Sequence, residues 1–229
     1  MAVYVTGDTH GFFDRLFGFP FEENDTLIVL GDAGINVDGG ARDRTFKLDV
    51  TEHIKCNVFC IHGNHEQRPS ELDCYQLVNY CGGKAWVDPE FPRLIFAKDG
   101  ESYDIENRNF FVIGGAYSVD KYYRLKRGWM WFENEQPSEE IKKYVEDNLE
   151  RRNYCVDVIL THTSPFDYRP THLFLVCVDQ STVDSSTEEW LQSIENKLNY
   201  NEWLFGHYHG DEQISPNIRM LYHDVYQVC

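Results

Sequence analysis

The chain has 229 residues, and no internal stretch reads as a linker, so we expect a single domain over residues 1–229. Hydrophobic residues make up 42% of the chain and aromatic residues 15%, which supplies a core and excludes intrinsic disorder. The 21 Lys and Arg against 38 Asp and Glu give a net charge of −17. This charge argues against duplex nucleic acid and against an anionic membrane as partners, because both bind clustered cations.

Targeting signals and cysteines indicate a cytoplasmic protein. No apolar run approaches the roughly 20 residues that a membrane-spanning helix needs. The N-terminal residues 1–8 read as the start of a strand, without the basic region and cleavage site of a secretory leader. The seven cysteines form no CxxC pair, which is typical of buried thiols in a reducing compartment rather than of a disulfide framework.

Five short apolar runs end abruptly at Gly, Asp, Asn or His. Continuous runs of this kind are typical of strands that are buried on both faces. In chain order, the predicted strands are Ala2–Thr6, Thr26–Leu30, Asn57–Ile61, Val156–Leu160 and Glu202–Phe205. Open α/β sheets place their sites at the carboxyl ends of strands, so the polar residues after these runs are candidate site residues.

Helical patterns and further strands lie between these runs. The predicted helices are Arg44–Ile54, Glu66–Tyr80, Ser138–Arg152 and Thr187–Leu198. The third is the clearest, because Ser138 can cap it and acidic residues fill its first turn. Three more strands are predicted in the middle of the chain: Arg93–Lys98, Ser102–Ile105 and Asn109–Gly114.

The segments that follow the five strands share an unusual set of side chains. They are Gly7–Gly11, Gly31–Gly34, Gly63–Glu66, Thr161–Thr163 and Gly206–Gly210. They contain Asp, Asn and His but no Cys, and these oxygen and nitrogen donors suit Mn, Fe, Zn or Ni ions. The pairs Asp8/His10 and His207/His209 are two residues apart, which puts both side chains on one face of extended backbone. Each signal is weak alone, but five in one structural context indicate a metal centre.

The order D-x-H, G-D, G-N-H-E, H and G-H-x-H, from residue 8 to residue 209, resembles the calcineurin-like metallophosphoesterase superfamily. The resemblance implies a four-layer α/β/β/α sandwich of two mixed sheets flanked by helices. It also implies two metal ions about 3.5–4 Å apart. The activity implied is hydrolysis of a phosphomonoester or phosphodiester by in-line attack of a metal-bridging hydroxide, so we expect a metal-dependent phosphoric ester hydrolase.

The resemblance also implies a role for each motif residue. One metal would be held by Asp8, His10 and His209, and the other by Asn64, His162 and His207, with Asp32 bridging both. His65 would not be a ligand but would act at the leaving-group oxygen, as a general acid or a transition-state stabiliser. Mn is the metal expected for both ions, and Fe, Zn, Ni and Mg are alternatives.

Two features leave the substrate open. The phosphoprotein-phosphatase branch carries an arginine after its Gly-Asp motif and another before Gly-Asn-His-Glu. This chain has neither, and His62 stands in the second position, as a candidate substrate contact. The segment Tyr117–Phe132 combines basic and aromatic residues, and we expect either a substrate loop with Arg124 and Lys121 as phosphate contacts or a packing segment.

The alternatives to the leading interpretation come from other functional classes. One is a non-catalytic metal-binding scaffold or interaction protein on the same fold. A protein Ser/Thr phosphatase and a nuclease are others, the first disfavoured by the missing arginines. Among phosphate esters, the sequence leans slightly toward a nucleotide-like or other small phosphodiester, and it leaves the oligomeric state open.

Overall fold

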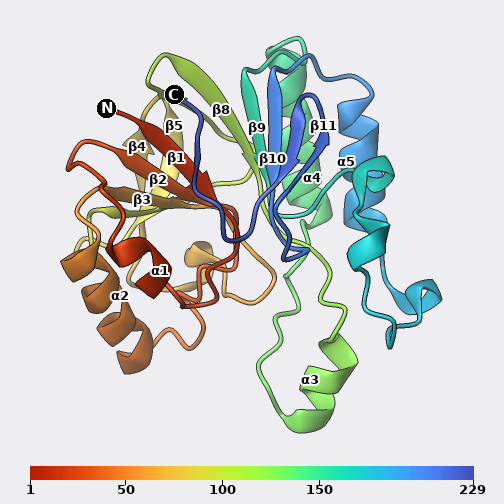
Figure 1. Cartoon of the computed structure of the whole chain (residues 1–229), viewed down its shortest axis with the longest axis horizontal. Coiled ribbons are helices and arrows are strands. Elements are labelled where there is room, and N and C mark those ends of the chain that lie inside the picture. The colour runs from red at the N-terminus through yellow and green to blue at the C-terminus, as the bar shows by residue number, and fades with distance from the viewer.

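The computed structural model describes residues 1–229 and arranges them in four layers (Figure 1). Two β-sheets lie face to face at the centre. Helices α1 (Asp14–Phe17) and α2 (Ala41–His53) cover the outer face of the first sheet, and α4 (Glu139–Arg151) and α5 (Ser186–Glu195) cover the second. The α/β/β/α sandwich expected from the sequence is confirmed.

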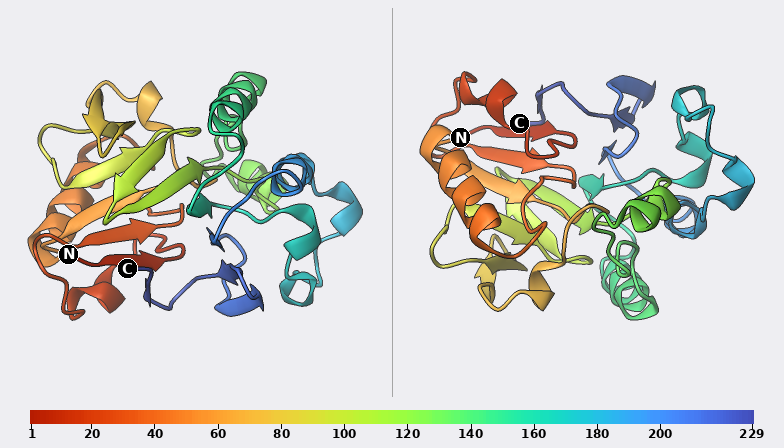
Figure 2. Two further views of the ribbon diagram at one scale, coloured as in Figure 1. Left: turned by 90° about the horizontal axis from the view of Figure 1, so that it is seen from above. Right: turned by 90° about the horizontal axis from the view of Figure 1, so that it is seen from below.

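The first sheet has seven strands. From edge to edge they are β13 (Tyr226–Gln227), β1 (Val3–Thr6), β2 (Thr26–Val29), β3 (Asn57–Cys60), β6 (Leu94–Ala97), β5 (Gly83–Val87) and β4 (Gln76–Tyr80). Strands β1, β2, β3 and β6 run parallel to one another. Strands β13, β5 and β4 pair antiparallel with their neighbours. The pairing of β13 with β1 brings the two ends of the chain close together (Figure 2).

The second sheet has six strands. In order they are β11 (Glu212–Ser215), β12 (Ile218–Met220), β10 (Glu202–Phe205), β9 (Val158–Thr161), β8 (Arg108–Ile113) and β7 (Ser102–Ile105). The inner pairs β12–β10, β10–β9 and β9–β8 are parallel. Strands β9 and β10 therefore end at one edge of the sheet, as β1, β2 and β3 do in the first sheet.

Three buried clusters form the core, and each fills one interface between layers. On β2, Ile28 points between the two sheets, whereas Leu27 and Val29 point toward the helices of the outer layer. On β10, Leu204 joins the cluster between the sheets, and Trp203 joins the cluster under α4 and α5. Both faces of these strands are thus buried, which explains their continuous apolar runs.

Most predicted elements are confirmed to within a few residues, but the helix predicted over Glu66–Tyr80 is wrong. Only a single turn of 3₁₀ helix, Pro69–Glu71, forms there, and the segment then becomes strand β4. Strand β4 pairs antiparallel with β5 along its whole length, and Tyr80 packs against Phe59. The pairing of β4 with the next strand outweighs the local helical spacing.

The expectation of buried cysteines holds only in part. Cys56 and Cys60 are buried in the core below α2, but Cys74, Cys81, Cys155 and Cys177 are exposed and Cys229 is half-buried. All seven are free thiols. No helix in the structure has the length and apolar character that crossing a membrane requires.

Candidate metal centre

The polar segments that follow the predicted strands meet at one edge of the two sheets. The meeting follows from the topology, because β1, β2 and β3 run parallel in one sheet and β9 and β10 run parallel in the other. Each side chain expected as a metal ligand lies within 3.8 Å of another member of that set: Asp8, His10, Asp32, Asn64, His162, His207 and His209.

Asp8 lies against His10 and His209. Its Oδ2 atom is 3.4 Å from His209 Nε2 and 3.8 Å from His10 Nε2, and these two imidazole nitrogens are 2.8 Å apart. Asp8 Oδ1 accepts the backbone N–H of His207, but Oδ2 is buried without a hydrogen-bond partner. A buried, unpartnered carboxylate oxygen beside imidazole nitrogens fits a cation, which would compensate the cost of burial.

Asn64 lies between His162 and His207. His162 Nδ1 donates to the carbonyl oxygen of Leu30 at 2.7 Å, so a neutral His162 has an unprotonated Nε2 atom. That Nε2 is 2.8 Å from Asn64 Oδ1, and His207 Nδ1 is 3.1 Å from the same oxygen. Burial lowers the pKa of His207 to about 3, so this ring stays neutral. Electron-pair donors converge here, as they do around a metal ion.

Asp32 lies between the two groups of side chains. Its Oδ2 atom is 3.8 Å from His162 Nε2 and 3.9 Å from both His10 Nδ1 and His65 Nε2. Its Oδ1 atom accepts the backbone N–H of His65 at 2.8 Å. Burial acts to raise the pKa of Asp32, but the surrounding imidazoles outweigh burial and lower it. Asp32 is therefore a carboxylate that faces both groups.

Carboxylate and imidazole atoms form two overlapping groups in which all ligand atoms lie within 4.8 Å of one another. One group is Asp8, His10 and His209, the set that the resemblance implies for one metal. The other is Asp8, Asp32 and His162, so Asp8 is common to both groups. The donors are carboxylate, amide and imidazole, without a thiolate, and this chemistry suits metal cations that prefer oxygen and nitrogen ligands.

The backbone around these side chains is strained. Four candidate ligands have positive φ angles, a region that side-chain-bearing residues rarely adopt: His10 (46°), Asp32 (46°), His207 (69°) and His209 (53°). Glycines make the close packing possible. A Cβ atom on Gly206 would lie 2.3 Å from Asp8 Oδ1, and one on Gly63 would lie 2.1 Å from the backbone nitrogen of Asp32. The glycines next to the candidate ligands therefore serve close approach.

Glu66 connects two of the ligand-bearing loops, a function that the sequence analysis missed. Its buried carboxylate accepts the backbone N–H of Gly63 at 2.8 Å and that of Ala33 at 3.1 Å. The loop after β3 is thereby joined to the loop after β2. The signal for Glu66 was its place as the fourth residue of the Gly-Asn-His-Glu motif.

The segment after β8 brings a cation to His65. It leaves the body of the molecule and contains α3 (Lys121–Arg127), which projects from the rest of the fold (Figure 1). Arg124 Nη2 lies 3.2 Å from His65 Nε2, while Arg124 Nε donates to Asp120 at 2.7 Å. Burial and the charge of Arg124 both act to lower the pKa of His65. Arg124 therefore lies against His65, the motif residue that is not an expected ligand.

The other two candidate substrate contacts lie elsewhere. The Lys121 ammonium lies 4.0 Å from the centre of the Trp131 ring. His62 is buried, and its ring nitrogens have no hydrogen-bond partner. It lines a separate cavity with Arg68 and Asp99, which form an ion pair. The structure thus brings Arg124, but neither Lys121 nor His62, against His65.

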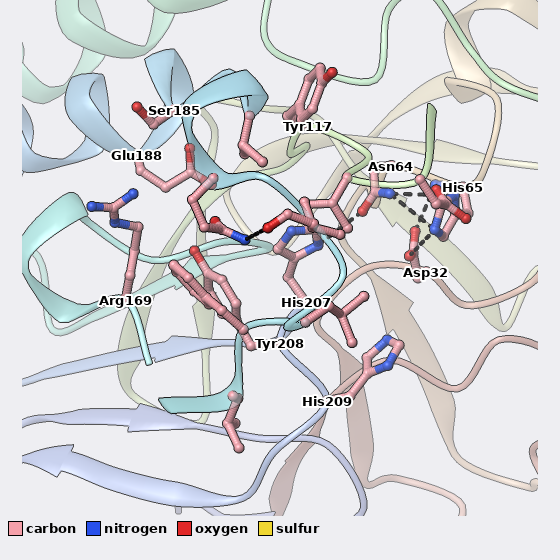
Figure 3. A pocket seen from close by; sticks show the side chains of 18 residues that line it. Asp32, Asn64, His65, Tyr117, Arg169, Ser185, Glu188, His207, Tyr208 and His209 are labelled. Carbon is pink, nitrogen blue, oxygen red and sulfur yellow. Dashed lines mark hydrogen bonds and ion pairs between the residues drawn. The ribbon is translucent and has the colours of Figure 1, made fainter. Parts of the chain in front are cut away.

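A cavity of about 390 Å³ opens beside the candidate ligands (Figure 3). Asp32, Asn64, His65, His207 and His209 form one side of it. The opposite side comes from residues 169–188, to which the sequence analysis gave no function. The available signal was the apolar run of residues 173–178 after Pro170, which belongs to no predicted strand or helix.

A comparison with protein-family models identifies the family of this chain. The family model described as calcineurin-like phosphoesterase matches residues 1–211. The chain therefore belongs to the calcineurin-like phosphoesterase family. Among solved structures, the crystal structure of TT1561 from Thermus thermophilus aligns with 98% of this chain and 96% of its own, at 12% identity and a TM-score of 0.49. No curated protein sequence matches the chain.

Membership of this family indicates metal-dependent hydrolysis of phosphate esters. Proteins of the family typically bind two metal ions, and this chain has the Asp and His groups that could hold them.

Proposed function

We propose that residues 1–229 form a single-domain, cytoplasmic phosphoesterase that uses two divalent cations, preferably Mn, to hydrolyse small phosphodiesters. The observation that carries this proposal is the buried Asp8 Oδ2 atom, which has no hydrogen-bond partner and lies beside two imidazole nitrogens. Such an oxygen is costly to bury in the absence of a cation.

The candidate ligands divide between two ions. Asp8, His10 and His209 would hold one ion, and Asn64, His162 and His207 would hold the other, with Asp32 between them. When bound, two such cations lower the pKa of water and neutralise charge on phosphoryl oxygens. The Leu30 carbonyl and the Ser118 hydroxyl orient His162 and Asn64, so both present their electron pairs toward the centre.

His65 and Arg124 act on the leaving group in this proposal. His65 Nε2 accepts from Arg124, so Nδ1 carries the proton of the neutral ring. This Nδ1–H group can donate a hydrogen bond to the leaving-group oxygen and stabilise the negative charge that develops there. The Arg124 guanidinium neutralises charge on the phosphoryl group. Asp120 keeps Arg124 in place through its hydrogen bond to Nε.

The proposed preference for diesters over monoesters follows from the small number of cationic side chains near the candidate ligands. A phosphomonoester carries nearly two negative charges and usually binds to a cationic clamp besides the metals. Arg124, which lies against His65, is already paired with Asp120, as Arg68 is with Asp99 and Arg44 is with Glu90. A diester has one charge and a second substituent, which the cavity beside His207 can accommodate.

The test combines metal analysis with two model substrates. Purified protein is analysed for metals by mass spectrometry and assayed, with and without Mn, on p-nitrophenyl phosphate and bis-p-nitrophenyl phosphate. We expect about two metal ions per chain and faster turnover of the diester. Faster turnover of the monoester would overturn the lean toward diesters. Two bound ions without turnover of either ester at any pH would favour the scaffold and contradict the proposed activity.

A further inference from the structure

The cavity beside the candidate ligands continues well beyond the residues needed for phosphate chemistry. Asp32, Asn64 and His65 line one end, and Arg169 and Glu188 lie at the other, with Tyr208 between (Figure 3). Its volume of about 390 Å³ lies within the range of pockets that bind small molecules. A group attached to a phosphate at the candidate ligands would therefore extend into this second part.

The wall of this second part is mainly apolar. Its apolar side chains come from turns that include η3 (Thr171–Leu173) and η4 (Gln180–Thr182), namely Leu173, Phe174, Leu175, Val178 and Val183. The Phe174 ring also stacks on the Tyr208 ring, with centroids 6.1 Å apart. Apolar and aromatic side chains at the mouth of a cavity are suited to a flat organic group rather than to a hydrated ion.

Glu188 is a polar residue of this wall that has an unused hydrogen-bond acceptor. It lies on α5 and is only 6% exposed. Its Oε1 atom accepts the Thr163 hydroxyl at 2.7 Å, but its Oε2 atom is buried and has no hydrogen-bond partner. Burial raises the pKa of Glu188. An unpartnered acceptor in a cavity wall costs free energy that a bound donor would recover.

Arg169 supplies the complementary charge. Its guanidinium lies 3.4 Å from the centre of the Phe166 ring, and its Nε donates to the Phe166 carbonyl oxygen at 3.0 Å. It forms no ion pair, so its remaining N–H groups are available to a ligand. Asp120, another carboxylate of the cavity wall, is already paired with Arg124. Glu188 and Arg169 thus offer one acceptor and one cationic donor.

We propose that this cavity binds the alcohol portion of the phosphoester as a neutral heteroaromatic group of the nucleobase type, with Glu188 Oε2 accepting an N–H and Arg169 donating to a ring acceptor. Glu188 and Arg169 are then the residues that determine substrate specificity. This inference rests on the proposed phosphoesterase function, because that function places the ester at the candidate ligands.

Other classes of alcohol fit this wall less well. A hydrocarbon group would leave Glu188 Oε2 buried and unpaired. A quaternary ammonium group would meet the charge of Arg169, and a carboxylate would meet the charge of Glu188. A heteroaromatic base carries both a donor and an acceptor, and its faces pack against apolar and aromatic side chains.

The first experiment measures binding without hydrolysis. Guanosine, adenosine, benzyl alcohol and choline are titrated separately into Mn-loaded protein by calorimetry, and none of them carries a phosphate. We expect a nucleoside to bind most tightly. We expect Glu188→Gln to weaken nucleoside binding about tenfold, because the amide oxygen of Gln is uncharged and accepts a weaker hydrogen bond than a carboxylate does. Tighter binding of benzyl alcohol or choline, or no binding of either nucleoside, would overturn the inference.

The matched control is Glu150→Gln, which makes the same chemical change at an exposed position of α4. It should leave nucleoside binding within twofold of the unmodified protein. Equal weakening by Glu150→Gln and Glu188→Gln would show a general effect of charge and count against the pocket. Arg169→Gln gives an independent test if Glu188→Gln fails to fold, and we expect it to weaken binding about tenfold as well.

A second experiment separates this inference from the proposed function. The ratio of kcat/KM for a p-nitrophenyl nucleotide diester to that for bis-p-nitrophenyl phosphate is compared in the unmodified protein and in Glu188→Gln. We expect the ratio to fall at least tenfold in the variant. Turnover of both esters with an unchanged ratio would overturn the inference and leave the phosphoesterase function intact. Nucleoside binding without turnover of any ester would contradict the proposed phosphoesterase function but would still support a nucleobase-binding cavity.

Discussion

The two sides of the cavity are built in different ways. The candidate ligands follow buried parallel strands, and Asp8, Asp32, Asn64 and His162 are at most 2% exposed. The facing side consists of turns between Arg169 and Glu188, where Leu175 is 56% exposed. The segments that carry the candidate ligands begin at the ends of strands whose backbones are held by sheet hydrogen bonds. The turns on the facing side depend on local contacts instead. In the proposed function, the chemistry therefore resides on the side built from strand ends, which we call the rigid side, and the selectivity resides on the side built from turns, which we call the variable side.

Replacing Asp32 with Asn should have the largest effect, because it removes the charge that faces both groups of candidate ligands. We expect kcat/KM for bis-p-nitrophenyl phosphate to fall by at least about 10³-fold, with less metal bound per chain. Asp147→Asn, on the exposed face of α4, is the matched control and should keep full activity. A folded Asp32→Asn protein with full activity would contradict the proposed centre.

His65→Ala tests a residue on the rigid side that is not an expected ligand. We expect kcat to fall about 10²-fold or more, the range for loss of a positioned hydrogen-bond donor that stabilises the transition state, while the metal content stays near two ions per chain. Metal analysis and activity are measured on the same preparation. Loss of metal together with activity would assign His65 to the ligand set instead.

Gly206→Ala tests whether the rigid side tolerates a shift in its backbone. The added Cβ atom would lie 2.3 Å from Asp8 Oδ1, so either the carboxylate or the loop after β10 must move. We expect about a 10²-fold loss of activity, because small displacements of catalytic groups have effects of this size. Gly18→Ala is the control, since a Cβ atom there meets nothing within 4 Å. Equal activities in the two variants would show that the ligand side is not rigid.

The rigid side is also the part that the sequence predicts. The strands before Asp8, Asp32, Asn64, His162 and His207 were visible as apolar runs, and the topology of parallel strands brings their ends together. The helix expected over Glu66–Tyr80 was wrong, because antiparallel pairing of β4 with β5 is a long-range contact that local periodicity does not report. The sequence predicted that the candidate ligands converge. It did not predict that Asp8 belongs both to the group with His10 and His209 and to the group with Asp32 and His162.

The variable side could not be predicted in the same way. Arg169 and Glu188 carry no local motif, and the residues between them form turns without a repeating apolar pattern. Their shared cavity arises only when the tertiary fold places these turns beside His207 and Tyr208 (Figure 3). The contact between Arg124 and His65 also depends on the tertiary path of the projecting segment, although its basic and aromatic composition marked it as a candidate.

Arg124→Gln probes the projecting segment and should have an intermediate effect. The variant loses the cation next to His65 but keeps a side chain that can donate a hydrogen bond. We expect about a tenfold loss in kcat/KM for p-nitrophenyl phosphate and a smaller loss for the diester, because the monoester carries more charge. Arg127→Gln, which removes a cation from the last turn of the same helix, is the control. Equal losses on both esters would contradict a role in neutralising phosphoryl charge.

Glu188→Gln should have the smallest effect, seen in stability as a function of pH. Burial raises the pKa of Glu188 in the folded protein, so the unfolded chain loses this proton at lower pH than the folded chain does. The carboxyl group therefore costs no stability below its unfolded pKa, and its cost grows as pH rises through the folded pKa. Gln carries no such cost, so Tm of the variant minus Tm of the unmodified protein should become more positive from pH 4 to pH 8.

The measurement is a series of thermal unfolding curves for both proteins in the same buffers, in which other titrating groups contribute equally and cancel in the difference. Glu150→Gln, the same chemical change at an exposed position of α4, is the matched control. A flat difference for Glu188→Gln would mean that its carboxylate is well solvated when folded. The side of the cavity that includes Glu188 would then hold no unsatisfied hydrogen-bond acceptor. The proposed contrast between a catalytic side and a side that selects the ligand would fail.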